Sequence, residues 1–368
     1  MTKSIPELVN KGIHKLGVYE PGKSVEELER ELGLSFSIKM ASNENPLGPS
    51  QKAVAAMQSH LNKLCTYPDT ECLPLKTALA GKHQVNLRQI VVGNGSNEIL
   101  ELITKVFLRE SDQVIFSEHG FAMYPLFAQA MGAEPVSVKD RNWCHDLDAM
   151  ADAVTDKTKI IFIANPNNPT GTWVSKGELK AFLKSIPEDV IVVVDEAYFE
   201  YVDQENYQSA LRYLHRFPNL IVTRTFSKVY GLANLRIGYA IASEEIAAYL
   251  NQVRQPFNVN GMAQVAALAA LEDQEYLLKS LETNALGMAQ LQMGVDALNL
   301  DYIPSVANFL TVHVGDKAAD IYQALLRTGY IVRPLAGYGM SQYLRITIGT
   351  ESQNQGLLTA LKDVLDHL

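Results

Sequence analysis

A lysine, an aspartate and an arginine follow two short apolar runs in the middle of the chain. Lys228 and Arg236 come after the run 220–223, and Asp195 comes directly after the run 190–194. A lysine amine can condense with a carbonyl group to form an imine. A carboxylate can keep the nitrogen of a pyridine ring protonated, which lets the ring store electrons. These residue types predict covalent chemistry in which Lys228 carries a carbonyl compound and Asp195 tunes its ring.

Other polar residues could bind a phosphate and a phenolic oxygen. The turn Gly95-Ser96-Asn97 opens a helical pattern, and the backbone N–H groups at a helix start bind anions. Ser227 and Arg236 can add a hydroxyl and a guanidinium to the same phosphate. Asn168 and Tyr198 can donate hydrogen bonds to a phenolate oxygen. The sequence thus supplies each group that a phosphorylated pyridine aldehyde would need.

These residues lie after short apolar runs that are rich in β-branched residues. Such runs are typical of strands that are buried on both faces of a sheet. Amphipathic stretches separate them, which indicates an α/β fold with a mostly parallel sheet. Because ligands bind outside the carboxyl ends of such strands, we expect the polar residues to converge on one rim. The runs are 89–92, 113–116, 159–164, 190–194, 220–223 and 237–242.

The pattern changes after about residue 250. Residues 261–295 carry the apolar spacing of a long helix, and the remaining tail alternates helix with short strands such as 343–348. A chain of this length favours more than one domain. We predict a large domain over residues 46–250. Residues 1–45 together with 251–368 would form an N-terminal arm and a smaller α/β domain.

The composition argues against several classes of partner. The chain has 368 residues, is 47% hydrophobic and carries a net charge of -9 without a block of Lys or Arg. It can therefore build a large core, but it offers no basic face to nucleic acid or to an anionic membrane. The cysteines form no C-x-x-C pair and the histidines have no ligand spacing, so we predict neither a disulfide framework nor a metal site. Without a signal-like or membrane-spanning run, we expect a cytoplasmic protein.

Three stretches carry a specific family resemblance. NPNNPTG (165–171), DEAY (195–198) and SKVYGLANLRIGY (227–239) resemble motifs of the fold-type I, aspartate-aminotransferase-like enzymes, which use pyridoxal phosphate (PLP). The resemblance implies that fold, with a large PLP-binding domain and a smaller α/β domain. It also implies that Lys228 holds the cofactor as an imine and moves the substrate's proton, while Asp195 pairs with the pyridine nitrogen.

The same resemblance assigns further contacts with the cofactor. Asn168 and Tyr198 would bond the 3-oxygen of the ring, and Tyr198 would join Lys228 and Asp195 as a catalytic residue. Phe121 would stack on the ring at a position where relatives often carry Tyr, so that stacking is kept and a hydroxyl contact is lost. The phosphate would be held by Gly95, Ser96, Asn97, Ser227 and Arg236.

A narrower resemblance concerns ASNENPLGPS (41–50), TYPD (66–69) and IVRPLAGYGMSQYLRITIGT (331–350). These stretches look like the histidinol-phosphate aminotransferases. By that resemblance Tyr67 would reach the cofactor phosphate of a partner subunit, so that the active unit is a homodimer with shared active sites. Arg345 would bind the carboxylate or phosphate of the substrate by a two-pronged contact. Further substrate contacts would come from Arg333, Asn43 and Tyr19.

The reaction implied is transfer of an amino group from glutamate to imidazole acetol phosphate, giving histidinol phosphate and 2-oxoglutarate. Two alternatives keep the fold and cofactor, namely an aromatic amino-acid aminotransferase and a threonine-phosphate decarboxylase. A third is a non-catalytic ligand sensor, but the intact Lys228 and Asp195 argue against it. Taken singly, Asp195 could cap a helix and Lys228 could be a solvated surface lysine. Their joint occurrence with the other motifs after successive strands favours the enzyme.

Overall fold

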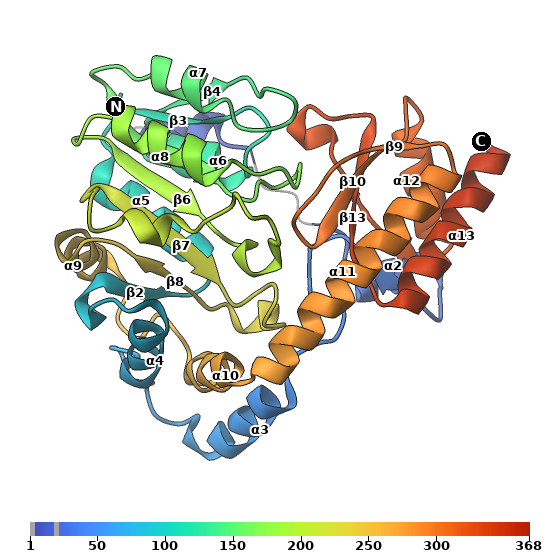
Figure 1. Ribbon diagram of the computed structural model, residues 1–368, viewed down its shortest axis with the longest axis horizontal. Coiled ribbons are helices and arrows are strands. Elements are labelled where there is room, and N and C mark those ends of the chain that lie inside the picture. The colour runs from blue at the N-terminus through green and yellow to red at the C-terminus, as the bar shows by residue number, and fades with distance from the viewer. Residues whose placement is uncertain (1–3, 18–21) are drawn as a thin grey trace.

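The computed structural model describes residues 4–17 and 22–368, which form two lobes side by side (Figure 1). The larger lobe contains a seven-stranded sheet with the order β2-β8-β7-β6-β5-β3-β4. Neighbouring strands are parallel, except that β8 is antiparallel to both β2 and β7. The strands are β2 (Ile90–Gly93), β3 (Gln113–Ser117), β4 (Glu134–Val138), β5 (Thr158–Ala164), β6 (Ile191–Asp195), β7 (Leu220–Thr225) and β8 (Gly238–Ile241).

Helices cover both faces of this sheet. Val192 and Val194 of β6 belong to one apolar cluster, whereas Ile191 and Val193 belong to another, as the alternation of side chains along a strand requires. The first cluster includes α3, α4, α7, α8 and α10, and the second includes α5, α6 and α9. Burial on both faces explains the continuous apolar runs. The helices are α3 (Gln51–His60), α4 (Leu73–His83), α5 (Ser96–Phe107), α6 (Met123–Ala130), α7 (Leu147–Asp152), α8 (Lys176–Ser185), α9 (Glu244–Val253) and α10 (Gly261–Glu272).

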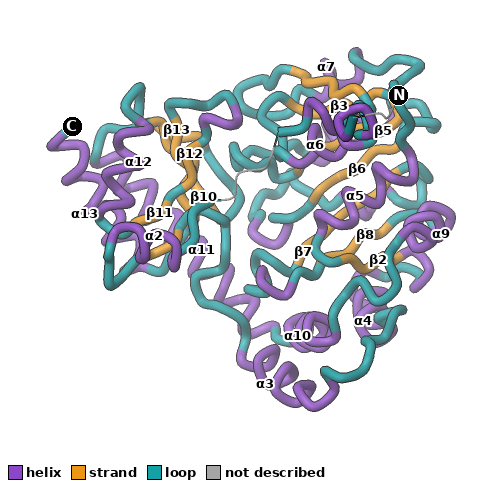
Figure 2. Tube along the Cα trace, turned by 180° about the vertical axis from the view of Figure 1, so that it is seen from behind, coloured by secondary structure: helices purple, strands orange, loops and turns teal. Residues whose placement is uncertain are grey.

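The smaller lobe contains a four-stranded antiparallel sheet with the order β12-β13-β10-β9. Helices α11, α12 and α13 share an apolar cluster with β10 and β13. A short parallel pairing of β1 with β11 brings the N-terminal segment to this lobe, and α2 lies beside it (Figure 2). The elements are β1 (Ile38–Lys39), β9 (Asp301–Ile303), β10 (Phe309–His313), β11 (Tyr330–Ile331), β12 (Arg333–Pro334), β13 (Tyr343–Thr347), α2 (Val25–Leu32), α11 (Gln274–Ala297), α12 (Ala318–Arg327) and α13 (Glu351–His367). The short helix α1 (Ile5–Leu8) lies near the N-terminal end, beside the larger lobe (Figure 1).

The structure confirms the predicted α/β fold with a mostly parallel central sheet, and the six apolar runs become β2, β3, β5, β6, β7 and β8. Strand β4 was not singled out because it is a half-buried edge strand that contains Pro135, a residue tolerated at sheet edges. The prediction of one long helix over 261–295 is wrong in one respect, because the chain forms two helices there. Asp273 ends α10 and caps α11 by accepting a hydrogen bond from the Tyr276 N–H at 3.3 Å. Both views show that α10 lies against α3 (Figures 1 and 2).

Three further features concern the described part of the chain. Its cysteines are unpaired: Cys65 is exposed, Cys72 is buried and Cys144 is intermediate. No helix of residues 4–17 and 22–368 is both long and apolar enough to cross a membrane. Within the same residues, no three His, Cys, Asp or Glu side chains are grouped so as to hold a metal ion.

A buried ion pair joins the ends of β6 and β7. Arg224 donates to the Glu196 carboxylate from Nε at 2.9 Å and from Nη2 at 2.7 Å, and both side chains are almost fully buried. The Ser209 hydroxyl and the Ala210 N–H also donate to Glu196, at 2.7 and 2.6 Å. These bonds offset the cost of removing the charges from water. They also fix the backbone next to Asp195 at the carboxyl edge of the sheet.

We expect Glu196→Gln to lower the free energy of unfolding by about 3 kcal/mol, because it removes the main counter-charge of a buried guanidinium. The matched control is Glu101→Gln, which breaks a half-exposed i,i+4 pair with Lys105 and should cost less than about 0.5 kcal/mol. Urea unfolding followed by circular dichroism measures both values. Equally small losses would contradict the role given to the buried pair.

Candidate active site

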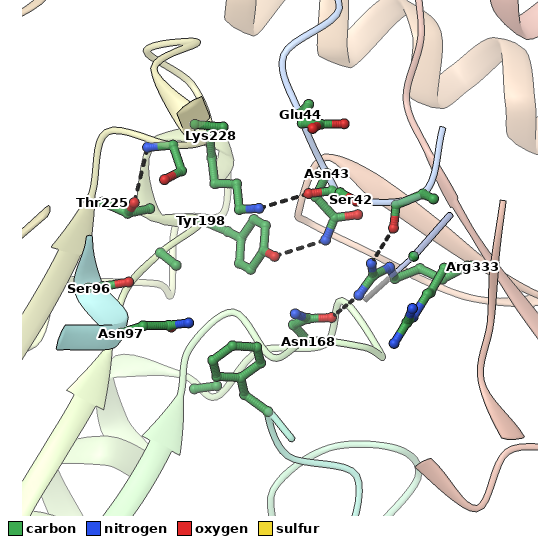
Figure 3. A pocket seen from close by; sticks show the side chains of 18 of the residues that line it. Ser42, Asn43, Glu44, Ser96, Asn97, Asn168, Tyr198, Thr225, Lys228 and Arg333 are labelled. Carbon is green, nitrogen blue, oxygen red and sulfur yellow. Dashed lines mark hydrogen bonds between the residues drawn. The ribbon is translucent and has the colours of Figure 1, made fainter. Parts of the chain in front are cut away.

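A cavity of about 850 Å³ lies where the carboxyl ends of the central strands face the smaller lobe. Its walls combine the ends of β5, β6 and β7 with residues of β1, β12 and β13. Figure 3 shows labelled side chains from both lobes around one space, among them Asn168, Lys228 and Arg333. The predicted site residues that line the cavity are Asn43, Ser96, Asn97, Phe121, Asn168, Asp195, Tyr198, Ser227, Lys228, Arg236, Arg333 and Arg345.

Lys228 follows β7, and its amine donates a hydrogen bond to the Ser42 carbonyl at 2.9 Å (Figure 3). Burial lowers the pKa of Lys228 to about 7. The positive charges of Arg345 and Arg236 act in the same direction, and Glu44 opposes them. The neutral amine is the nucleophilic form. A large share of Lys228 can therefore attack a carbonyl carbon near neutral pH.

Asp195 ends β6 and is buried against the cavity. The hydroxyls of Thr223 and Tyr124 donate to its two carboxylate oxygens at 3.0 and 3.1 Å. Burial raises the pKa of Asp195 to about 6, and these two hydrogen bonds limit the rise. Sequence reasoning missed both hydroxyl donors. Thr223 lies beside Asp195 only because the parallel register pairs these two positions of β6 and β7.

The start of α5 forms another wall of the cavity. Gly95, just before this helix, has a φ of +82°, and a Cβ there would lie 2.5 Å from Nη2 of Arg236. Arg236 itself has a left-handed φ of +53° and donates to the Ser227 hydroxyl at 3.3 Å. Backbone N–H groups of Ser96 and Asn97, a guanidinium and a hydroxyl thus converge. This is the donor set that binds a phosphate.

Tyr198 and Asn168 of the larger lobe accept hydrogen bonds from residues that lie outside its sheet. The Asn43 amide donates to the Tyr198 hydroxyl at 2.8 Å, and Arg345 of β13 donates to the Asn168 side-chain oxygen. Arg345 also donates to the Ala41 carbonyl at 2.7 Å. Burial raises the pKa of Tyr198 to about 12, although Arg345 and Asn43 oppose the rise. The phenol therefore stays protonated and can donate a hydrogen bond at neutral pH.

Phe121 contributes an aromatic face to the cavity. Its ring meets Tyr124 edge-on at 5.6 Å between centroids, and Tyr124 stacks on Phe162 at 4.6 Å with an interplanar angle of 2°. Tyr124 and Phe162 are fully buried in the core. The chain of rings fixes Phe121 against the sheet, as a residue that stacks on a flat ligand requires.

Two predicted site residues, Gly95 and Tyr67, do not line the cavity, and a third, Tyr19, lies outside the described residues. Gly95 is not itself a lining residue but abuts Arg236. Tyr67 is 81% exposed and stacks on Phe257 at 4.6 Å, so it does not line the cavity of its own chain. Tyr19 lies outside the described residues. The roles predicted for these three residues stay predictions.

Several lining residues were not predicted. Ser42 acts through its backbone, because its carbonyl accepts from Lys228, whereas Thr225 acts through its side-chain hydroxyl, which accepts from the Ser227 N–H at 3.0 Å. The motif that contains Asn43 includes Ser42, but the residue type could not predict this contact because every residue has a backbone carbonyl. The other unpredicted lining residues with polar or charged side chains are Glu26, Lys39, Glu44, Asn234 and Tyr338.

Comparisons with known proteins agree with this site. A family model described as "Aminotransferase class I and II" matches residues 37–361, and the chain belongs to this family. It is 50% identical over 97% of both chains to histidinol-phosphate aminotransferase 1 of Idiomarina loihiensis, and 51% identical over 98% of both to histidinol-phosphate aminotransferase 2 of Pseudomonas aeruginosa. The crystal structure of histidinol-phosphate aminotransferase from Sinorhizobium meliloti, in complex with pyridoxal-5'-phosphate, superimposes with a TM-score of 0.90 at 28% identity over 98% of both chains. The predicted fold and enzyme class are confirmed.

The lowered pKa of Lys228 predicts how stability depends on pH. Between about pH 7 and pH 10.5 the folded chain holds this amine neutral while the unfolded chain protonates it, so wild-type stability rises with pH across that window. Lys228→Met removes this dependence. We expect the ligand-free variant to be more stable than ligand-free wild type by on the order of 3 kcal/mol at pH 7 and by less than about 1 kcal/mol at pH 10. Urea unfolding at both pH values measures the difference, and a gap that does not shrink with pH would contradict it.

Proposed function

We propose that this chain is a PLP-dependent transaminase that moves an amino group from glutamate to imidazole acetol phosphate, giving histidinol phosphate and 2-oxoglutarate. One observation carries the proposal: a nucleophilic amine, a buried carboxylate and a phosphate-type donor set line the same cavity, in a chain half identical to histidinol-phosphate aminotransferases over nearly its whole length. The enzyme would act in histidine biosynthesis.

The donor set fits the cofactor. Lys228 would bind the aldehyde of PLP, Asp195 would face the ring nitrogen, and Ser96, Ser227 and Arg236 would hold the phosphate beside Gly95. A Cβ on residue 95 would lie 2.5 Å from Nη2 of Arg236, so glycine there leaves room for this guanidinium beside the proposed phosphate position. Asn168 and Tyr198 would donate to the 3-oxygen, and Phe121 would stack on the ring. When bound, PLP supplies a ring that stores the electron pair left by the substrate's α-proton.

The residues of the chain provide the proton transfer and the charges around it. Nζ of Lys228, which is largely neutral above pH 7, can accept a proton from the substrate's α-carbon and return it. Asp195 is charged above about pH 6 and so favours a protonated ring nitrogen. Tyr198 stays protonated and donates.

Arg345 and Arg333 are proposed to bind the anionic group that the substrates have in common. They face each other across the β12–β13 register, and both line the cavity. A guanidinium binds carboxylate or phosphate oxygens in the same two-pronged way. One arginine pair can therefore take the α-carboxylate of glutamate and the phosphate of the acceptor in turn. Asn43, and by the family resemblance Tyr19, would complete this contact.

We further propose a homodimer in the cytoplasm, with Tyr67 reaching the cofactor phosphate of the partner subunit. Its exposure in the single chain supports a contact made outside that chain. The stacking on Phe257 would hold the ring in place for such a contact.

The substrate is tested by a panel assay on purified protein with PLP. We expect glutamate to drive conversion of imidazole acetol phosphate at least about tenfold more efficiently than conversion of phenylpyruvate. Decarboxylation of threonine phosphate, assayed in parallel, should be absent. No turnover of imidazole acetol phosphate would overturn the proposed substrate, and efficient phenylpyruvate turnover instead would favour an aromatic aminotransferase.

The roles of Lys228 and Asp195 predict two different losses. Lys228→Ala should bind PLP yet lose transamination by roughly 10⁴-fold, because the group that moves the proton is gone. Asp195→Ala should lose far more rate than cofactor occupancy. Absorbance in the visible range reports occupancy, borohydride trapping reports attachment to Lys228, and single-turnover kinetics report the rate. Activity near that of wild type in either variant contradicts its role.

A mixed-dimer experiment tests the shared site. We expect Tyr67→Ala to weaken PLP binding by roughly tenfold, because it removes a hydrogen bond to phosphate. In a mixed dimer of Tyr67→Ala and Lys228→Ala chains, one site keeps its own Lys228 together with an intact Tyr67 from the partner. In each mixed dimer one of the two sites should therefore regain PLP affinity and activity. Absence of any recovery in verified mixed dimers would show that Tyr67 acts within its own chain or not at the site.

A further inference from the structure

Hydrogen bonds to both the backbone and the side chain of Asn43 fix this residue between the two lobes. Asn43 is 1% exposed and has a left-handed φ of +57°, a conformation that Asn tolerates better than most residues. Its N–H donates to the Thr347 hydroxyl at 2.9 Å, and its carbonyl accepts from the Asn308 amide at 3.0 Å. Its side-chain amide contacts the Thr347 hydroxyl at 3.2 Å and the Tyr198 hydroxyl at 2.8 Å (Figure 3). The amide group is therefore held at both ends.

The backbone N–H of Asn43 sets the order of donors and acceptors along these bonds. A backbone N–H can only donate, so the Thr347 hydroxyl accepts from it and is left to donate its own proton. Within residues 4–17 and 22–368 the other partner of this hydroxyl is Oδ1 of Asn43, which accepts. If the amide were turned over, the Thr347 hydroxyl would face two donors and its proton would have no acceptor in the described part of the chain. An unmade hydrogen bond of this kind is costly in a buried place.

This order determines what the Tyr198 hydroxyl does. With Oδ1 of Asn43 facing Thr347, the group that faces Tyr198 is Nδ2, which can only donate. The Tyr198 oxygen therefore accepts, and its own proton remains for another acceptor. Tyr198 lines the cavity, and Nζ of Lys228 lies 5.8 Å from the centre of its ring. A ligand joined to Lys228 thus lies on the side of the cavity that Tyr198 lines.

We propose that Asn43 is a positioning residue that directs the proton of the Tyr198 hydroxyl towards the 3-oxygen of the cofactor ring, with Thr347 fixing the orientation of the Asn43 amide. This inference rests on the proposed function, because it takes PLP as the ligand of the cavity. The substrate contact proposed for Asn43 is compatible with it, since Nδ2 carries two hydrogens and Tyr198 takes one. Thr347 ends β13 of the smaller lobe, so this lobe helps to set a hydrogen bond on the cofactor.

Asn43→Asp tests the direction of the hydrogen bond. The new carboxylate can only accept, so Tyr198 would donate to it and be lost to the ring. A donor to the 3-oxygen draws negative charge from the ring and loosens the proton held beside it. In substrate-free enzyme with bound PLP, we therefore expect the midpoint pH of the visible absorbance change to rise by about one unit, as in Tyr198→Phe. A role in substrate binding alone would change KM for glutamate and leave this midpoint where it is in wild type.

A double-mutant cycle separates the added charge of Asn43→Asp from the lost hydrogen bond. If Asn43 acts through Tyr198, adding Asn43→Asp to a Tyr198→Phe chain should move the midpoint by less than about 0.3 pH unit further. A full further rise would mean that the charge acts on the cofactor directly, and it would overturn the inference. An unchanged midpoint in Asn43→Asp alone would overturn it as well.

Thr347 offers a matched pair of variants that leave Asn43 in place. Thr347→Val keeps the shape of the side chain but frees the Asn43 amide to turn over, so the midpoint should rise, by less than in Tyr198→Phe. Thr347→Ser keeps the hydroxyl and should stay within about 0.2 pH unit of wild type. Equal midpoints in these two variants would contradict the orienting role, even if Asn43→Asp did not fold. Wild-type protein that shows no visible absorbance band after incubation with PLP would contradict the proposed function itself.

Discussion

Asp195 and Glu196 are adjacent and buried at the end of β6, but only Glu196 is paired with a cation of the protein. Glu196 has a dedicated cation in Arg224, together with two further donors. Asp195 receives hydrogen bonds from Tyr124 and Thr223 and faces the cavity. Burial of a carboxylate is costly unless a positive charge compensates it. The fold thus keeps the charge of Asp195 available for a cation that enters the cavity, and a protonated pyridine nitrogen is such a cation.

Burial raises the pKa of Asp195 but lowers that of Lys228, because surroundings of low polarity favour the neutral form of both groups. The amine becomes nucleophilic while neighbouring arginines keep the cavity attractive to anions. A phosphate bound beside Arg236 would cancel part of the positive field that lowers the pKa of Lys228. Binding of the anion and the protonation of the amine are therefore coupled, and the whole-molecule charge of -9 does not enter this local balance.

Sequence reasoning found the parts of the site that depend on residue type and missed those that depend on register. Asp195 stands directly after an apolar run, and Asn168 and Lys228 follow theirs within five residues, so parallel-sheet geometry was enough to bring the three together. The hydrogen bond from Thr223 to Asp195 could not be predicted, because only the β6–β7 register places the two residues side by side. The break at Asp273 was missed because apolar spacing continues through a residue whose side chain caps the next helix. The packing of α10 on α3 is likewise a long-range contact that no local pattern specifies.

The two lobes supply different groups to the cavity. The groups proposed for the cofactor come from the larger lobe, whereas Arg333, Arg345 and Lys39 come from the smaller lobe and the strand paired to it. Hydrogen bonds from Asn43 to Tyr198 and from Arg345 to Asn168 join the two sets. A substrate held by Arg345 is thereby placed relative to the residues that bond the ring. Because Arg345 also lowers the pKa of Lys228, a change on the smaller lobe would affect both the placement of the substrate and the amine that reacts with it.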